Sequence, residues 1–112
     1  MPSLSVWLEF EEGSAIGPQD VHLLEEIAKR GSISGASRSL KASYWSVWRR
    51  VRTLNALLNA PVVEVGIGGS SGGLAALTRH GRILVKVYRQ LEQNALAATK
   101  AELQIAPGVR RP

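Results

Sequence analysis

The sequence predicts a mainly helical fold with a small β-hairpin and a long C-terminal helix. Two helical patterns lie close together near the middle of the chain. Two short β-prone runs follow, on either side of a glycine-rich stretch, and an apolar helical pattern then fills most of the last third. Two helices joined by a tight turn and followed by a hairpin form a winged helix-turn-helix. The 112 residues suit one such domain, expected over residues 1–106, with a flexible tail at 107–112.

A short strand and a helix are expected first. Apolar residues alternate with their neighbours over Leu4–Phe10, and this period of two is typical of a strand with one buried face. Residues 13–17 are expected to form a loop. Pro18 suits the first turn of a helix, and Gly31 suits its end after two basic residues. A helix is therefore predicted over about Pro18–Arg30.

The helix-turn-helix is predicted over about residues 34–58. Ser34 can cap a short helix that runs to about Leu40, and Ser43 can cap a second helix over about Tyr44–Leu58. The second helix has one apolar stripe at helical spacing, formed by Val47, Val51, Leu54 and Leu58.

The wing is predicted over about residues 62–77. Two β-prone runs, Val62–Val65 and Leu74–Leu77, can pair around a glycine-rich tip. The glycine run lacks the Gly-Lys-Ser/Thr ending of a phosphate-binding loop and the third glycine of a dinucleotide-binding turn. A flexible wing is the better interpretation, with Ser70 and Ser71 placed to contact a phosphate strand or the minor groove.

A last helix is predicted over about residues 78–103, with Thr78 as its cap. Its apolar positions follow spacings typical of a coiled coil. Packing against its own domain is one interpretation, and a homodimer seam is the one we favour, because paired domains can read two half-sites of DNA. The expected seam residues are Leu84, Val87, Tyr88, Leu91, Ala95 and Ala98.

The positive charge is concentrated in the predicted helix-turn-helix. The chain has a net charge of +5, but residues 1–31 carry −4, whereas residues 32–60 carry +5 without a single acidic residue. A basic face of this kind most often binds a phosphate backbone, and a solvated basic surface is the alternative.

The predicted recognition helix begins after Ser43. Arg49 can form a bidentate contact with guanine, Ser43 and Ser46 can donate to phosphate or base, and Tyr44 and Trp45 can contact thymine methyl groups or pack on the backbone. For Trp48, packing in the core is favoured over contact with DNA. For Tyr44, packing and DNA contact are equally expected. For Trp45, the alternative to DNA contact is contact with a partner chain. The predicted DNA-binding set is completed by Ser34 and by basic residues expected to clamp phosphates, namely Arg38, Lys41, Arg50, Arg52, Arg79 and Arg82.

Enzymatic and membrane functions find little support. The two histidines, His22 and His80, lie in different elements without metal-ligating neighbours, and no nucleophile–base pair can be nominated. We therefore expect no catalytic residue, metal or cofactor. The absence of cysteine excludes disulfides and fits a reducing compartment, and no apolar run is long enough to span a bilayer. The N-terminus does not resemble a signal peptide, so a cytoplasmic protein is expected.

Three motifs resemble the N-terminal DNA-binding domain of the ModE family of molybdate-responsive regulators, which is close to LysR-type domains. They are Gly31-Ser32-Ile33-Ser34, then Ser43-Tyr44-x-Ser46-x-Trp48, and finally Leu77-Thr78-x-x-Gly81. The resemblance covers about residues 4–100, and it rests on the order and spacing of the motifs together.

The resemblance implies a dimeric DNA-binding domain whose recognition helix starts at Ser43-Tyr44. It implies that Ser43, Tyr44, Trp45, Ser46 and Arg49 face the groove. The turn before that helix departs from the family pattern, because Lys41-Ala42 stands where glycine and a branched apolar residue are common. A left-handed Lys41 would cost about 1–2 kcal/mol. The family's molybdate-binding domains follow the DNA-binding domain, so no molybdate site is expected within residues 1–112.

These observations together predict a winged-helix transcriptional regulator that binds double-stranded DNA as a homodimer. The alternative is a protein-interaction module that keeps the fold but binds another protein through the last helix and Trp45, because fold alone does not imply function. A hydrolase or nucleotide-binding enzyme is disfavoured by the failed phosphate-loop match.

Overall fold

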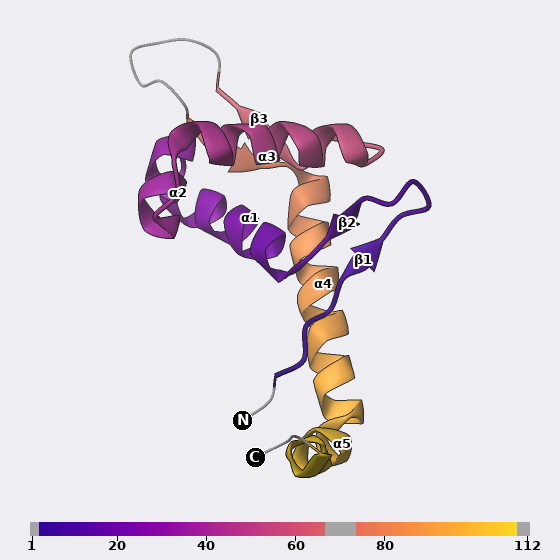
Figure 1. Ribbon diagram of the computed structural model, residues 1–112. Helices are drawn as coiled ribbons and strands as arrows, with labels where there is room; N and C mark the ends of the chain where they lie inside the picture. Colours follow the sequence, from indigo (N-terminus) through magenta and orange to yellow (C-terminus); the bar gives the residue numbers. More distant parts are fainter. Residues whose placement is uncertain (1–2, 67–73, 110–112) are drawn as a thin grey trace.

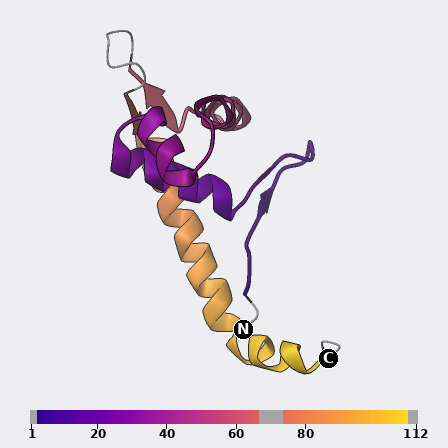
Figure 2. The same ribbon diagram turned by 60° about the vertical axis from the view of Figure 1, so that its left-hand side comes forward.

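The computed structural model describes residues 3–66 and 74–109, and it consists of a head and a stalk (Figure 1). The head contains three helices and a two-stranded sheet, which are α1 (Pro18–Arg30), α2 (Ile33–Leu40), α3 (Tyr44–Leu57), β3 (Val63–Val65) and β4 (Ala75–Leu77). The stalk is α4 (Arg79–Ala98), with α5 (Lys100–Ile105) and the 3₁₀ turn η1 (Ala106–Val109) bending away from its far end (Figure 2). The predicted fold class, mainly helical with a small hairpin and a long last helix, is confirmed.

An N-terminal arm runs beside α4 and ends in a second small hairpin. Its strands are β1 (Leu8–Glu9) and β2 (Ala15–Ile16), which pair antiparallel with Leu8 opposite Ile16. Burial alternates along the arm as the sequence predicts, but the ladder is only two residues long. The expected loop at residues 13–17 was wrong in part, because β2 lies inside it. Ile16 is fully buried there, and that burial holds the second strand in place.

Helix α1 has the predicted bounds, and both ends have a physical cause. Asp20 accepts a hydrogen bond from the backbone N–H of Gly17 (2.9 Å), which satisfies a donor at the start of the helix. At the other end Gly31 adopts φ 73°, and its N–H bonds to the carbonyl of Ile27 (2.8 Å). Glycine tolerates this left-handed conformation without steric cost, so it ends the helix.

Helix α2 begins two residues earlier than a Ser34 cap would place it, because its cap is Ser32. The Ser32 hydroxyl accepts from the N–H of Gly35 (2.8 Å). The earlier start places Ile33 in the first turn, where its side chain is fully buried. The two other predicted caps are confirmed, since Ser43 accepts from Ser46 N–H and Thr78 from Gly81 N–H, both at 3.0 Å.

The wing strands pair as predicted, with Val63 opposite Leu77 and Val65 opposite Ala75. Asn55, on α3, fixes the first strand in place. Its carbonyl oxygen accepts from the N–H groups of Val62 (2.8 Å) and Val63 (3.1 Å), and its amide donates to the carbonyl of Val63 (3.0 Å). Helix α3 and the wing are thereby held in one fixed relation. The tip of the predicted wing, with Ser70 and Ser71, lies outside the described residues.

The single last helix predicted over residues 78–103 is divided in two. Helix α4 ends at Ala98, and Thr99 has φ −113° and ψ 13°, outside helical geometry. The Thr99 hydroxyl donates to the carbonyl of Ala95 (2.5 Å). Threonine side chains that bond back in this way compete with the backbone ladder and bend helices. The chain therefore turns at Thr99, and α5 leaves the stalk axis.

The core fills the space between α1, α2, α3 and the wing, and it extends to the first turns of α4. Its fully buried large side chains include Ile16, Leu24, Ile27, Ile33 and Leu54. Tyr88 also belongs to it, with no exposed surface and its hydroxyl donating to the carbonyl of Val6 (2.8 Å). The prediction that Tyr88 lies on a dimer seam conflicts with this burial, because the N-terminal arm lies against its hydroxyl.

An ion cluster joins α1 to α4. Arg89 donates to both carboxylate oxygens of Glu25 (2.6 and 3.0 Å) and to Glu92 (2.8 Å). The hydrogen bond from Arg89 lowers the pKa of Glu25 below its ordinary value of 4.5. A carboxylate whose pKa is lower in the folded state contributes stability above its unfolded pKa and loses that contribution as the pH falls through the folded pKa.

We expect Glu25→Gln to lower stability at pH 7 by about 0.5 kcal/mol, a small effect because the pair is partly exposed. The difference from wild type should shrink as the pH falls below about 4.5. Urea unfolding at pH 7, 5 and 3 measures this difference. Glu102→Gln, on the exposed α5, is the matched control and should show neither effect. If the difference in unfolding free energy between wild type and Glu25→Gln did not change with pH, the ion pair between Glu25 and Arg89 would not contribute to stability as described.

Candidate nucleic-acid interface

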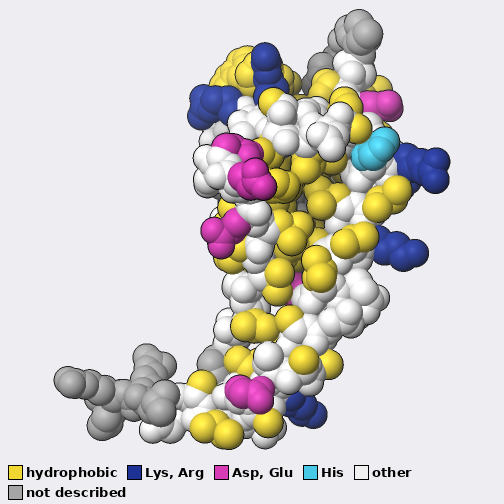
Figure 3. Space-filling model, turned by 90° about the vertical axis from the view of Figure 1, so that its right-hand side faces the viewer, with side chains coloured by type: hydrophobic (Ala, Val, Ile, Leu, Met, Phe, Trp, Pro, Cys, Tyr) yellow, Lys and Arg dark blue, Asp and Glu magenta, His cyan; other side chains and the backbone are white. Residues whose placement is uncertain are grey.

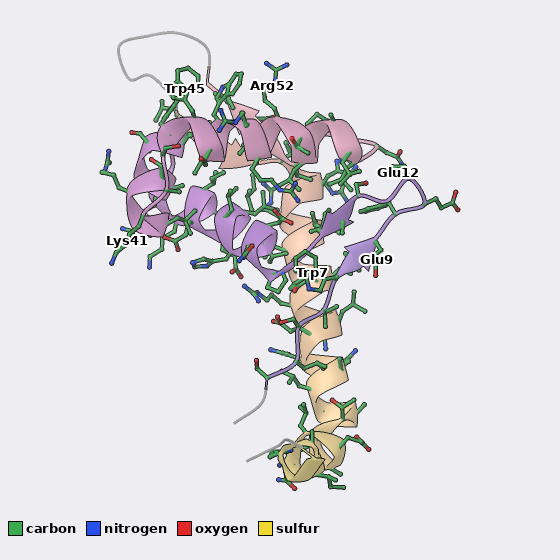
Figure 4. All side chains as sticks on the ribbon, in the orientation of Figure 1. Trp7, Glu9, Glu12, Lys41, Trp45 and Arg52 are labelled. Carbon is green, nitrogen blue, oxygen red and sulfur yellow. The ribbon has the colours of Figure 1, made fainter. Side chains whose placement is uncertain are left out.

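The outward side of α3 is the main candidate interface. Trp45, Ser46, Arg49 and Arg52 are all exposed on this helix, whereas Val47, Val51 and Leu54 face the core. Figure 4 shows Trp45 and Arg52 projecting from α3 away from the rest of the molecule. The apolar stripe thus sets the rotation of the helix and leaves its polar and aromatic face to solvent.

The start of α3 is preorganised by its cap and by the turn before it. Ser43 accepts from Ser46 N–H and also donates to the Ser46 hydroxyl (2.9 Å). Lys41 has φ 56° and ψ 40°, the left-handed conformation whose cost the sequence predicts. The N-terminal residues of a recognition helix are those that reach base edges. The cap and the turn hold the corresponding residues of α3 in place.

A connected aromatic and cationic cluster covers the α3 face. Trp45 contacts Tyr44 (5.3 Å between ring centroids) and Trp48 (5.6 Å), in both cases edge to face. The guanidinium of Arg52 lies over the Trp48 ring at 4.9 Å. Trp48 and Tyr44 are partly buried and pack against the core, in keeping with the core role favoured for Trp48. Trp45 is the aromatic residue of the cluster that remains in solvent.

Arg50 does not belong to this face. Its Nε and Nη2 donate to the two carboxylate oxygens of Asp20 (2.6 and 2.8 Å), and Nη2 also donates to the carbonyl of Ala15 (3.1 Å). The predicted phosphate-clamp role for Arg50 conflicts with this position, because the guanidinium is bound to Asp20, which is itself buried. The pair ties α3 to α1 and to the N-terminal hairpin.

The remaining predicted phosphate ligands lie on two other elements. Arg38 is exposed on α2 and donates to the hydroxyl of Ser34 (3.3 Å), while Lys41 is exposed at the end of α2 (Figure 4). Arg79 and Arg82 are exposed in the first turn of α4, next to the wing, where Arg82 donates to the carbonyl of Leu77 (3.1 Å).

One basic residue near α2 escaped the sequence analysis. Arg30 and Arg38 line a polar hollow of about 360 Å³ together with Ser32, Gly35 and Ser39. Arg30 also donates to Glu26 and to Ser39, each at 3.4 Å. The signal was present, because Arg30 ends α1 two residues before Ser32, but a basic residue in the last helical turn was interpreted only as a helix stop.

Neither a metal site nor a membrane span is found in the part of the chain that the structure describes. Over residues 3–66 and 74–109, no group of three histidine or acidic side chains could hold an ion. Within the same ranges, no helix is long and apolar enough to cross a bilayer.

A winged helix-turn-helix with an acid-free, exposed recognition helix defines the class of the chain as a helix-turn-helix domain of the type found in transcriptional regulators. The chain belongs to a particular family of that class, the bacterial regulatory helix-turn-helix proteins of the lysR family, whose model matches residues 18–82. The matched segment runs from the first residue of α1 to the first turn of α4.

Its relatives of known sequence are longer proteins. The chain is 40% identical over 97 residues to the molybdenum-pterin-binding protein MopA of Rhodobacter capsulatus, covering 87% of this chain and 36% of the relative. It is 36% identical over 86 residues to the DNA-binding transcriptional dual regulator ModE of Escherichia coli K12, covering 77% of this chain and 33% of the relative. The chain therefore spans about a third of the length of these relatives.

Solved structures share the fold. Full-length LysG of Corynebacterium glutamicum with bound effector Arg superposes with a TM-score of 0.55 at 30% identity, covering 80% of this chain and 28% of LysG. The DNA-binding domain in the CbnR–DNA complex superposes with a TM-score of 0.61, covering 79% of this chain and 95% of that domain. Its identity is 18%, so this second likeness concerns the fold alone.

Proposed function

We propose that the chain binds double-stranded DNA in a sequence-specific manner as a homodimer and acts as a transcriptional regulator. The observation that carries the proposal is the exposed face of α3, which lies in a segment with five basic residues and no acidic one. A major groove admits an α-helix, and clustered cations next to it bind the flanking phosphates. Membership of a family of bacterial regulatory proteins supports the proposal. A DNA-binding regulator of this kind would work in the cytoplasm and would need neither catalytic residues nor cofactors.

The proposed contacts fall into two groups. Ser43, Trp45, Ser46 and Arg49 enter the major groove with the first turns of α3. The side chains around them that we propose as phosphate ligands are Arg38, Lys41, Arg52, Arg79 and Arg82. Arg50 is left out because Asp20 holds its guanidinium.

The proposed dimer seam is the exposed apolar side of α4. Figure 3 shows hydrophobic side chains running along the stalk. Val87 and Leu91 are 48% and 40% exposed, and Ile83, which the sequence analysis did not include, is 47% exposed. Ile83 and Val87 also line a groove of about 290 Å³, together with the apolar residues Leu58, Ala60, Val62 and Leu84 and the polar residues Asn59 and His80. Exposed apolar residues gathered in this way mark an interaction surface.

Fluorescence anisotropy with labelled duplex DNA across a salt series tests the proposal. Binding should weaken steeply as salt rises, because each neutralised phosphate releases a counterion. Duplexes selected from a random pool should bind more tightly than unselected ones. Absence of DNA binding at low salt would contradict the proposal. Salt-insensitive binding to a protein would favour the interaction-module alternative, for which the exposure of Trp45 is the specific observation.

We expect Arg49→Ala to relax sequence preference by about 1–3 kcal/mol, because a bidentate arginine–guanine contact discriminates by this amount. Competition between selected and unselected duplexes measures the effect. Lys100→Ala is the control, since it removes one positive charge from α5, at the far end of the stalk from α3. Unchanged preference in Arg49→Ala would remove this residue from the groove.

A further inference from the structure

Trp45 is an exposed apolar residue in the candidate interface, and attraction between basic side chains and phosphates does not explain its position. It is the second residue of α3, directly after the capped turn, and 61% of its surface is exposed. Trp48, one turn further along, is partly buried against the core. Because the energy of burial follows the area removed from water, a side chain that exposes this much apolar surface contributes little stability to the chain itself.

The orientation of Trp45 is set before any ligand arrives. Its ring lies edge to face with both Tyr44 and Trp48, and those two rings are anchored on the core. Arg52 lies over the second of them. A rigid aromatic side chain loses little conformational entropy on binding, and this makes it an effective contact residue.

The chemistry of the major groove limits what such a residue can recognise. Guanine, cytosine and adenine present hydrogen-bonding atoms on their major-groove edges, and thymine adds an apolar C5-methyl group. Indole has a single N–H donor and no acceptor, so Trp45 cannot form the bidentate contacts that identify guanine or adenine. Its single N–H could donate to N7, O6 or O4, acceptors that guanine, adenine and thymine share between them, so this bond discriminates poorly among bases. Apolar contact with the methyl group of thymine is the interaction by which Trp45 discriminates best.

We propose that Trp45 is a specificity-determining residue that reads a thymine C5-methyl group at the start of α3 in each half-site. The proposal rests on the proposed function and deepens it, because it names the base that this chain selects. Arg49 would identify its base by hydrogen bonds one turn later, while Trp45 identifies thymine by shape and apolar contact.

The test compares thymine with deoxyuridine, which has the same hydrogen-bonding edge but lacks the methyl group. The protein selects duplexes from a random pool, and the tightest one is synthesised with one thymine at a time replaced by deoxyuridine. We expect one thymine per half-site at which the replacement weakens binding about fourfold, the factor that one buried methyl-sized group is worth. Trp45→Ala should bind the thymine and deoxyuridine duplexes equally, measured at low salt where phosphate contacts keep binding detectable.

Trp7→Ala is the matched control, because Trp7 is a second exposed tryptophan, 53% accessible, on the N-terminal arm. It should keep the fourfold discrimination, and thermal melts should show that both variants are folded. Retained discrimination in Trp45→Ala overturns the proposal, as does a wild-type protein indifferent to every replacement. If the wild-type protein is insensitive to every replacement but still binds selected DNA with a steep salt dependence, the proposed function holds and only the role of Trp45 is wrong. If no duplex is selected, both are wrong.

Discussion

Gly81→Ala should lower the stability of the chain by about 3 kcal/mol and its Tm by more than about 10 °C. Gly81 is buried in the first turn of α4, against the backbone of Val62, the residue that precedes β3. An ideal Cβ at this position would lie under 3.0 Å from the carbonyl oxygen of Val62, a separation that real Cβ atoms essentially never show. The neighbouring atom belongs to the backbone, so a side-chain rotation cannot relieve the clash.

The direction of the stability change at Gly81 distinguishes the clash with Val62 from the effect of helix propensity. Alanine is the better helix former by about 1 kcal/mol, so Gly81→Ala would stabilise α4 if only helix propensity mattered. Gly108→Ala is the control, because no atom lies within 4 Å of the Cβ that it would add. Thermal unfolding by circular dichroism measures both variants. A Gly81→Ala protein as stable as wild type would show that α4 and the wing are not packed as closely as the structure has them.

The close approach at Gly81 also explains one of the motifs in the sequence. The Leu77-Thr78-x-x-Gly81 pattern combines the last wing residue, the cap of α4 and the glycine that lets the wing backbone contact the helix. Thr78 contributes a second link, because its hydroxyl donates to the carbonyl of Pro61 (2.6 Å). The motif therefore fixes the direction in which the stalk leaves the head.

Local chemistry predicted most of the elements. Helix α1 was predicted with its observed bounds because Pro18 and Gly31 act through their own backbone conformations. The start of α2 was misplaced because Ser32 and Ser34 are both acceptable caps, and the burial of Ile33 decides between them. The end of α4 was missed because threonine is tolerated within helices, and only the Thr99 bond to Ala95 reveals the bend.

Two of the predicted site residues, Arg50 and Tyr88, are held by partners far away in the chain. Arg50 follows Arg49 in a basic run, and no pattern within α3 shows that its partner is Asp20 on α1. Tyr88 occupies a regular position in the apolar repeat of α4, but the arm that covers it comes from the opposite end of the chain. Periodicity predicts which face of a helix is apolar, and it does not predict what covers that face.

Tyr88→Ala should destabilise the chain by about 3–5 kcal/mol, because it removes a fully buried aromatic ring and leaves a cavity between α4 and the N-terminal arm. Tyr88→Phe keeps the ring and loses only the hydrogen bond to the Val6 carbonyl, at a cost of about 1 kcal/mol. Urea unfolding measures both, and equal losses in the two variants would contradict the packing role of the ring.

Leu91→Lys separates this core role from the proposed dimer seam. Leu91 is 40% exposed on α4, one turn beyond Tyr88, so placing a charge there should weaken self-association. Sedimentation velocity across protein concentrations should then show a dimer for wild type and Tyr88→Phe, and a monomer for folded Leu91→Lys. If Tyr88→Phe were a monomer and Leu91→Lys a dimer, the result would instead place Tyr88 in the dimer interface. The apolar repeat of α4 would thus be divided between two roles, with Tyr88 facing the arm that covers it and Leu91 facing a second copy of the chain.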